Sequence, residues 1–136
     1  MSTTASPVGK LSVEKTPIFG MGLEYSIRLA PWNIARIRLE RLSAVRFYVH
    51  WVYVPPAYRS AGIGGILLAR VLKDADREGI TLCLEARACG EISQAALESW
   101  YRAHGFRDAR GPVHHGGRAM SRSPIRSASR RLRVAS

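Results

Sequence analysis

Residues 45–68 read VRFYVHWVYVPPAYRSAGIGGILL and join a strand to a helix through a glycine-rich turn. The first ten residues, 45–54, are rich in β-branched and aromatic side chains, which favour extended backbone. Pro55 and Pro56 cannot donate hydrogen bonds to a central strand ladder, so they end the predicted strand. Three glycines lie in the turn and in the first residues of the predicted helix.

A helix and a second strand follow this turn. Apolar residues recur at helical spacing over 63–75, and Gly79 provides a C-terminal cap. Residues 80–86 alternate in hydrophobicity, which predicts a strand. A strand, a helix and a strand in this order form a right-handed crossover between parallel strands. The helical pattern is carried by Ile63, Ile66, Leu67, Val71, Leu72 and Ala75.

The remaining patterns complete a mixed body of the α/β (α+β) class. Residues 23–29 alternate with a period of two and predict a strand. Residues 32–42 fit a strand, because apolar residues alternate with arginines, and also fit a helical stripe. We favour the helix, with Pro31 near its start. Ser93 is a predicted N-cap for a second helix that ends at Gly105.

The chain has 136 residues, which corresponds to about one domain. Its 46% hydrophobic and 23% charged residues exclude a wholly disordered or collagen-like protein. We predict a domain over 17–123 between flexible segments at 1–16 and 124–136. The sequence shows neither a membrane helix nor a signal peptide pattern, so we expect a cytoplasmic protein without a membrane partner. The two cysteines are too few for a disulfide framework or a zinc site.

The glycine-rich turn predicts an anion site. Glycines between a strand and a helix let backbone N–H groups converge, and the helix N-terminus adds partial positive charge. Two common phosphate motifs do not fit. The third glycine of a Rossmann fingerprint is Leu67 here, and the Gly-Lys-Ser/Thr of a P-loop is missing. For an isolated pair of glycines, a purely structural tight turn is the alternative interpretation.

This stretch resembles the acetyl-coenzyme A (acetyl-CoA) signature of the GCN5-related N-acetyltransferase (GNAT) family, Arg/Gln-x-x-Gly-x-Gly/Ala. Arg59, Gly62 and Gly64 match it. The segment YRAHGF at residues 101–106 is similar to the family's Tyr-x-x-x-Gly-Phe element. The resemblance covers residues 49–106 and implies the GNAT acyl-CoA N-acyltransferase fold, with a mixed central sheet and splayed strands. It also implies an enzyme that transfers an acetyl group from acetyl-CoA to a primary amine.

The resemblance further implies how the donor binds and reacts. The strand before the signature holds pantetheine by backbone hydrogen bonds, and the signature loop binds the pyrophosphate. A backbone N–H near Val54 stabilises the oxyanion. Tyr101 matches the family's acid, which protonates the departing thiolate, and a core aromatic on a helix face is the alternative. The implied cofactor-binding residues are Val52, Val54, Arg59, Ser60, Ala61, Gly62, Ile63, Gly64 and Gly65.

The general base has two candidates. An alkyl ammonium titrates at about 10, so a base must remove a proton before the amine attacks. The family often uses an acidic residue in the strand before the signature, and residues 45–54 contain none. His50 is a candidate because histidine exchanges protons near neutral pH. Glu85 on the next strand is the second. For both, an ordinary solvated or structurally paired side chain is the alternative. We interpret His114 and His115 as solvated loop residues, and no metal is expected.

The acceptor side is short for the family, because its walls must fit into about residues 17–44. We therefore expect an acceptor site that is open or completed by a second chain in a homodimer. The net charge of +11 favours polyanionic partners, and small amines, proteins and amine-bearing nucleobases in DNA all stay open as acceptors. The alternative function is a non-catalytic basic module that binds nucleic acid through its arginine-rich surface and tail. The tail arginines are Arg122, Arg126, Arg130, Arg131 and Arg133.

Overall fold

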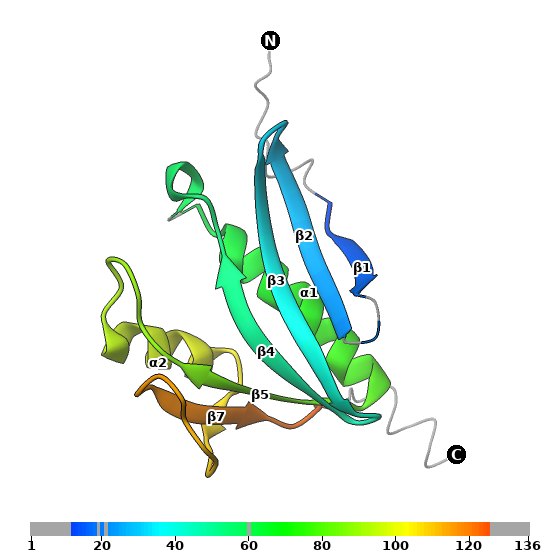
Figure 1. The fold of residues 1–136 in the computed structure, drawn as a ribbon, viewed down its shortest axis with the longest axis vertical. Helices are drawn as coiled ribbons and strands as arrows, with labels where there is room; N and C mark the ends of the chain where they lie inside the picture. The colour runs from blue at the N-terminus through cyan, green and yellow to red at the C-terminus, as the bar shows by residue number, and fades with distance from the viewer. Residues whose placement is uncertain (1–11, 19, 21, 60, 126–136) are drawn as a thin grey trace.

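The computed structural model describes residues 12–18, 20, 22–59 and 61–125. Within these residues one seven-stranded sheet has the order β1-β2-β3-β4-β5-β7-β6, and two α-helices pack on it (Figure 1). The helices are α1 (Ile63–Glu78) and α2 (Gln94–Ala103), and a short 3₁₀ helix covers Pro56–Tyr58. The strands are β1 (Glu14–Ile18), β2 (Gly22–Ala30), β3 (Asn33–Ser43), β4 (Arg46–Tyr53), β5 (Thr81–Ala86), β6 (Arg107–Asp108) and β7 (Arg118–Arg122).

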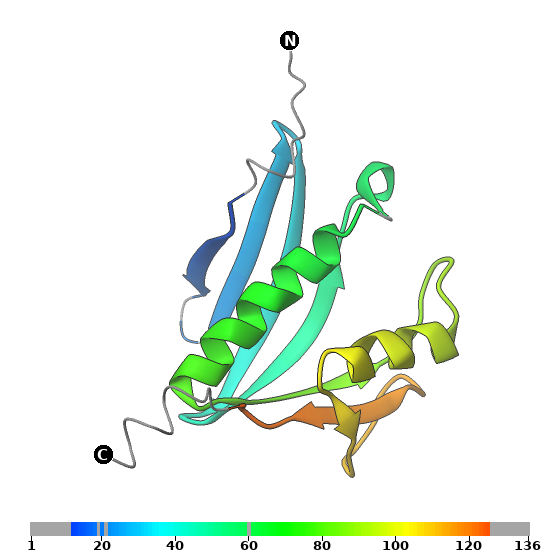
Figure 2. The same ribbon diagram turned by 180° about the vertical axis from the view of Figure 1, so that it is seen from behind.

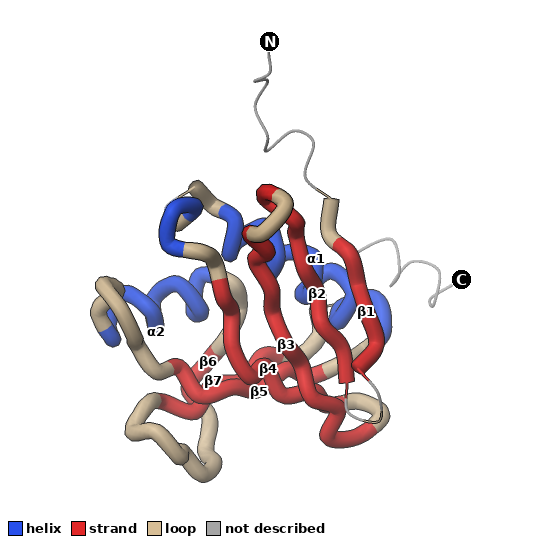
Figure 3. Tube along the Cα trace, turned by 45° about the horizontal axis from the view of Figure 1, so that its top comes forward, coloured by secondary structure: helices blue, strands red, loops and turns tan. Residues whose placement is uncertain are grey.

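The sheet combines an antiparallel meander with one parallel pair. Strands β1 to β4 pair antiparallel in sequence order, β5 joins β4 in parallel, and β7 and β6 continue antiparallel. Helix α1 connects β4 to β5, which confirms the predicted strand–helix–strand unit with parallel strands. Both helices lie on the same side of the sheet, α1 across β2 to β4 and α2 beside β5 (Figure 2). Among the described residues, no helix covers the other face of β2 to β4 (Figures 1 and 3).

The hydrophobic core lies between α1 and the sheet. Alternate residues of β3, namely Ala35, Ile37 and Leu39, are buried against the helix. The helix presents a buried stripe to them because its apolar residues recur every three or four positions. Each valine, leucine or isoleucine side chain among them contributes about 1.5–3 kcal/mol when fully buried. The stripe consists of Ile63, Leu67, Leu68, Val71, Leu72 and Ala75.

A buried carboxylate ties α1 to the first strands. Asp74 is 3% exposed and accepts a hydrogen bond of 2.8 Å from the Tyr25 hydroxyl of β2. Arg70 lies 3.2 Å from the carboxylate and Lys15 of β1 lies 3.8 Å away. Burial alone would raise the pKa of Asp74, but the Tyr25 hydrogen bond and the two cations outweigh burial and lower it. The charged form is therefore the one that the fold stabilises.

Strands β4 and β5 pair over only half of β4 and then separate. Their parallel register runs from Arg46 opposite Thr81 to Val49 opposite Leu84. Beyond Val49, β4 continues along β3 to Tyr53, and β5 continues along β7. The two strands form a V that opens toward the glycine-rich turn and toward α2 (Figures 1 and 2). The prediction of splayed strands in a mixed sheet is confirmed.

The helix predicted for residues 32–42 is wrong. This segment is β3, which pairs with both β2 and β4. The helical stripe that favoured the other interpretation includes Trp32, which is 93% exposed, and Leu42, which is 50% exposed. The alternation of apolar residues with arginines was the informative pattern. It buries one face of β3 under α1 and leaves the arginines on the other face, where Arg38 bonds Glu24 of β2 at 2.9 Å.

Arg122 belongs to the sheet, not to a solvated tail. It ends β7, is 5% exposed, and its guanidinium makes bonds of 2.8 and 3.1 Å to the Asp76 carboxylate. Regular structure also starts at Glu14, ahead of the Pro17 boundary. Of the segments predicted to be flexible, 1–16 and 124–136, residues 1–11 and 126–136 lie outside the described residues. No helix in the described part of the chain is long and apolar enough to cross a membrane.

Candidate active site

The opening between β4 and β5 is bordered by three elements. A Cβ placed on Gly64 in the first turn of α1 would lie 3.7 Å from Val54 Cγ2, 3.8 Å from Val52 Cγ1 and 4.0 Å from Trp100 of α2. The end of β4, the start of α1 and the middle of α2 therefore converge beside the opening. The two valines implied for the donor site thus lie beside one of its glycines.

The glycine-rich turn presents backbone donors that have no partner among the described residues. Gly62 caps α1 in the left-handed region at φ +79°, a conformation that favours glycine. The hydrogen bond of 3.0 Å from the Ile66 N–H to the Gly62 carbonyl starts the helix. The N–H groups of Ile63, Gly64 and Gly65 precede that bond, so the helix itself does not use them. The first turn contains no acidic side chain that would compete for them.

This arrangement fits a pyrophosphate. Several backbone donors at one helix N-terminus attract an anion, and small residues let it approach closely. A Cβ on Gly62 or Gly65 would meet no atom within 4 Å, so space lies in front of both. Ala61 is exposed in the same turn, whereas Ser60 lies outside the described residues.

Arg59 holds the turn against the end of β4. Its Nε donates a hydrogen bond of 2.9 Å to the Val54 carbonyl. The backbone of the turn is closed by a bond of 2.9 Å from the Tyr58 N–H to the Pro55 carbonyl. On its other side the Arg59 guanidinium lies near Gly90, in the loop that follows β5. Arg59 thus connects the two loops at the mouth of the opening and adds positive charge there.

Tyr101 lies on α2 within an aromatic cluster. Its ring packs edge-on against Trp100 at 5.1 Å and against Phe106 at 5.4 Å between ring centroids. Burial raises its pKa to about 12, so the hydroxyl stays protonated at neutral pH. No hydrogen bond to the hydroxyl appears within the described part of the chain. The ring of Tyr101 is therefore buried, whereas its unpartnered hydroxyl oxygen stays accessible, because no buried side-chain oxygen of the described residues lacks a partner.

The Tyr-x-x-x-Gly-Phe element ends α2 in a glycine-dependent turn. The Phe106 N–H donates to the Tyr101 carbonyl at 3.1 Å. Gly105 adopts φ +94°, and a Cβ there would lie 3.0 Å from Arg122 Nε. The glycine is required for both reasons, and it lets Phe106 fold back onto the tyrosine ring. The element therefore sets the position of Tyr101.

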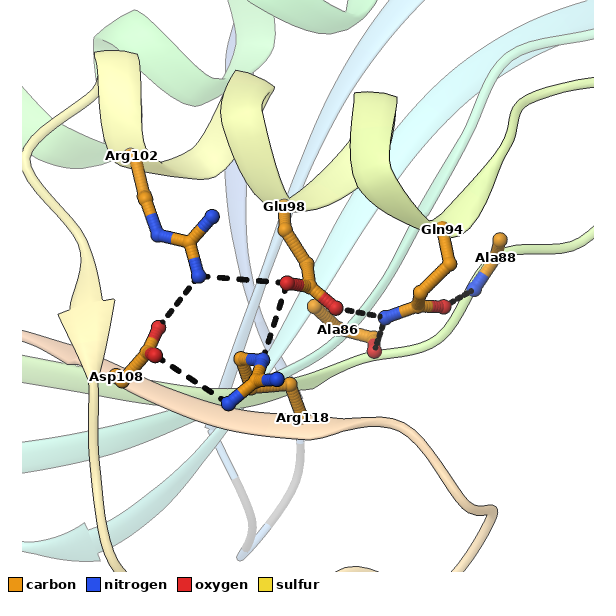
Figure 4. A network of polar contacts seen from close by, with 7 residues as sticks. All are labelled: Ala86, Ala88, Gln94, Glu98, Arg102, Asp108 and Arg118. Atoms are coloured by element: carbon orange, nitrogen blue, oxygen red, sulfur yellow. Dashed lines mark hydrogen bonds and ion pairs between the residues drawn. The ribbon is translucent and has the colours of Figure 1, made fainter.

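A polar network fixes α2 on the sheet (Figure 4). Gln94 donates to the Ala86 carbonyl at 2.8 Å and accepts from the Ala88 N–H at 2.9 Å, just beyond β5. It also donates to Glu98 at 2.7 Å. This Gln94 bond, followed by the charges of two arginines, outweighs desolvation and lowers the pKa of Glu98. The network continues through Arg102 of α2, Asp108 of β6 and Arg118 of β7.

His50 lies on the face of the sheet that α1 does not cover. It occupies a bulge in β4, because Leu39 pairs with Val49 while the preceding Arg38 pairs with Trp51. Its Nε2 lies 2.7 Å from the Glu40 carboxylate of β3. The side chain is 41% exposed. His50 therefore stands next to the point where β4 leaves β5.

Glu85 anchors a loop. Its carboxylate accepts backbone hydrogen bonds from His114, His115 and Gly117 at 2.8 to 2.9 Å. These bonds, the His114 one first, hold the pKa of Glu85 below its usual range. A carboxylate so engaged is a weak base, which supports the structural alternative for this residue. Within the described residues no group of three or more His, Cys, Asp or Glu side chains could hold a metal ion.

The site thus contains residues that the sequence pointed to and others that it did not. The structure brings Val52, Val54 and Gly64 together around the opening. Trp100 and Glu40 were missed. Trp100 directly precedes the tyrosine of the matched element, which was a usable signal. Glu40 lies in the segment taken for a helix, and its neighbour in space, His50, is ten residues away in sequence.

A family model described as an acetyltransferase (GNAT) domain matches residues 31–108, more than half of the chain. The chain therefore belongs to the GNAT acetyltransferase family and is an acyltransferase that uses acetyl-CoA. No curated protein matches it.

Solved structures agree with the fold. An IAA acetyltransferase from Bacillus cereus shares 17% identity over 83% of this chain and 99% of that chain, with a TM-score of 0.62. A GNAT family acetyltransferase from Elizabethkingia anophelis with acetyl-CoA bound shares 17% identity over 83% and 97%, with a TM-score of 0.61. The ribosomal-protein-S18-alanine N-acetyltransferase from Escherichia coli shares 22% identity over 77% and 71%, with a TM-score of 0.59. At these identities the likeness concerns the fold.

Proposed function

We propose that the protein transfers the acetyl group of acetyl-CoA to a primary amine. The observation that carries this proposal is the opening between β4 and β5, with the free N–H groups of Ile63 to Gly65 at its mouth. The unpaired edge of β4 offers an extended pantetheine arm the backbone hydrogen bonds that β5 would otherwise take. The turn offers the pyrophosphate its anion site. Arg59 contributes a cation to the same mouth.

In the proposed reaction a C–N bond forms and the thioester C–S bond breaks. His50 takes a proton from the acceptor ammonium, and the neutral amine attacks the acetyl carbonyl. A backbone N–H near Val54 stabilises the negative charge that develops on the carbonyl oxygen. Tyr101 gives its proton to the departing sulfur, and the nitrogen releases its second proton as the amide forms, which restores the Tyr101 hydroxyl by way of solvent. The hydroxyl has no hydrogen-bond partner within the described residues, so it is available for this step.

The acceptor approaches from the sheet face opposite α1. Strands β2 and β3 follow one another through the turn at Pro31 and Trp32, so no helix stands there to wall the acceptor off within the described residues. An open face accommodates a bulky acceptor, such as a protein terminus or an amine on a macromolecule, and a homodimer could complete it. The E. coli neighbour acts, by its name, on an alanine of a ribosomal protein. We therefore rank protein amines first among the acceptors to be tested.

The test is an acceptor screen with labelled acetyl-CoA over small amines, peptides, proteins and amine-bearing DNA. Thiol release is followed at the same time, so that transfer is separated from hydrolysis. The expected result is thiol release that depends on one class of acceptor and is matched by label in that acceptor. Binding of CoA without transfer to any acceptor, together with salt-dependent DNA binding, would instead support the non-catalytic alternative.

A further inference from the structure

Glu40 and His50 form a carboxylate–imidazole pair on the open face of the sheet. We propose that Glu40 is a positioning residue: it holds the His50 ring so that Nδ1 removes the proton from the acceptor amine. The inference rests on the proposed acetyl transfer and adds to it the residue that orients the base. Glu40 Oε1 lies 2.7 Å from His50 Nε2.

The sheet register produces this pair. In the ladder between β3 and β4, Glu40 lies opposite Tyr48, so the glutamate and the tyrosine share a face. His50 follows Tyr48 by two residues, which places it on the same face, and it is the extra residue of the bulge that follows Val49. The His50 and Glu40 side chains are 41% and 34% exposed. The pair is thus built by the backbone and is open to a reactant.

The bond to Glu40 determines which ring nitrogen is free. An ionised carboxylate can only accept hydrogen bonds, so Nε2 must carry the hydrogen that joins the two groups. In the neutral ring Nδ1 is then the acceptor, and it is the atom that can take a proton. After it does so, the Glu40 charge stabilises the imidazolium. The proton leaves to solvent because the ring is exposed, and His50 returns to its starting state.

The groups around the ring are compatible with this role. Tyr48 packs edge-on against His50 at 4.9 Å between ring centroids. Burial, and then the Glu85 and Cys83 side chains of β5, raise the pKa of Tyr48, which keeps it neutral. Glu40 from β3 is thus the charged group that contacts the ring. Two further acids lie on this face: Glu24 is held by Arg38 at 2.9 Å and Arg36 at 3.9 Å, and Glu85 is held by the backbone N–H groups of the 114–117 loop.

The position of the pair matches the proposed donor site. Val49 is the last residue of β4 that pairs with β5, and His50 is the next residue. The unpaired edge of β4, which would bind the pantetheine arm, therefore starts at His50 and runs toward Val54. An amine that reaches His50 from the open face meets the donor at the point where the two strands separate.

A double-mutant cycle tests the inference on the full chain. Glu40→Gln, His50→Ala and the double variant are compared with Glu24→Gln, which neutralises another glutamate on the same face without touching His50. Glu40→Gln is expected to lower kcat at least tenfold and to leave the KM for acetyl-CoA unchanged. In the His50→Ala background the same change should have no further effect, and added imidazole should restore part of the lost rate. Glu24→Gln should change kcat less than twofold.

Ring ¹⁵N shifts provide a readout independent of turnover. The wild type should show His50 as the Nε2–H tautomer, whereas a mixture of tautomers would overturn the inference. An equal loss of kcat from Glu40→Gln with and without His50, or wild-type kcat in Glu40→Gln, would also overturn it while the acetyl transfer stands. Absence of transfer from the wild-type protein to any acceptor would overturn the proposed function itself, so the two failures are distinguishable.

Discussion

Helix α1 has a glycine in the left-handed region at each end. The same substitution at the two ends can therefore separate an effect on donor binding from an effect on stability. Gly62 at the N-cap has φ +79° and Gly79 at the C-cap has φ +72°. A Cβ at either position would meet no atom within 4 Å. Gly62→Ala and Gly79→Ala therefore impose the same backbone strain without any clash. They differ in that the first lies at the predicted anion site and the second lies one helix length away.

The expected magnitudes follow from this geometry. An alanine in the left-handed region costs about 1–2 kcal/mol, and the stiffer unfolded chain offsets about 0.4–1 kcal/mol. The net loss is about 1 kcal/mol, which lowers Tm by roughly 3–6 °C in a domain of this size. Relaxation of Gly62→Ala would also turn N–H groups away from the anion site. Loss of one hydrogen bond to a charged group is worth about 1.5–3 kcal/mol, or more than tenfold in Kd.

Thermal melts and calorimetric titration with CoA measure both quantities on the same samples. We expect equal drops in Tm for the two variants and a CoA affinity reduced more than tenfold in Gly62→Ala alone. Equal CoA affinities in the two variants would refute the assignment of the N-terminus of α1 as the pyrophosphate site. Unequal Tm values would refute the strain argument.

Three further outcomes are expected. Tyr101→Phe should lower kcat about 10²-fold to 10⁴-fold in steady-state assays without changing Tm or CoA affinity. An unchanged kcat would show that Tyr101 has a structural role only. The pKa values of Asp74 and Asp76 are lowered in the fold, so their stabilisation is present above the ordinary value of 3.8 and is lost as the pH falls through the lower folded values. Acid unfolding followed by circular dichroism should be flatter in Asp74→Asn, and an equally steep curve would contradict this. Truncation after Ile125 removes four arginines and should preserve small-amine turnover. It should also reduce the slope of log affinity for duplex DNA against log salt concentration by roughly 0.9 per lost phosphate contact. An unchanged slope would show that these arginines contact no phosphate.

Local sequence patterns were sufficient to predict an element where only one type of secondary structure would bury all of its apolar residues. The stripe over 63–75 has a single buried face, and Gly79 ends α1 with the left-handed cap that its position suggested. Ser93 likewise caps α2, accepting a bond of 3.0 Å from the Ala96 N–H. Residues 32–42 offered two apolar stripes of similar quality. The choice between a strand and a helix depended on pairing with the neighbouring strands β2 and β4, which a local sequence pattern does not reveal.

Contacts between residues far apart in the chain explain the other features that the sequence did not predict. Arg122 looked like the first cation of a basic tail, because its partner Asp76 lies 46 residues earlier in the chain. β7 has one fully buried side chain, Met120, so its hydrophobic pattern was too weak to predict a strand. The Glu40 and His50 pair joins two strands whose register shifts by one residue at a bulge, which a local pattern does not reveal. The glycine-rich turn between a strand and a helix could be predicted because its glycines and both elements are contiguous in the sequence.

The central claim is that acetyl-CoA binds in the opening between β4 and β5, and amide NMR spectra recorded during an acetyl-CoA titration test it most directly. The account predicts saturable shifts that cluster at residues 50–54 and 61–65, with smaller changes at Trp100 and Tyr101. Shifts confined to the arginines of β7 and the following residues, or the absence of any saturable change, would contradict it.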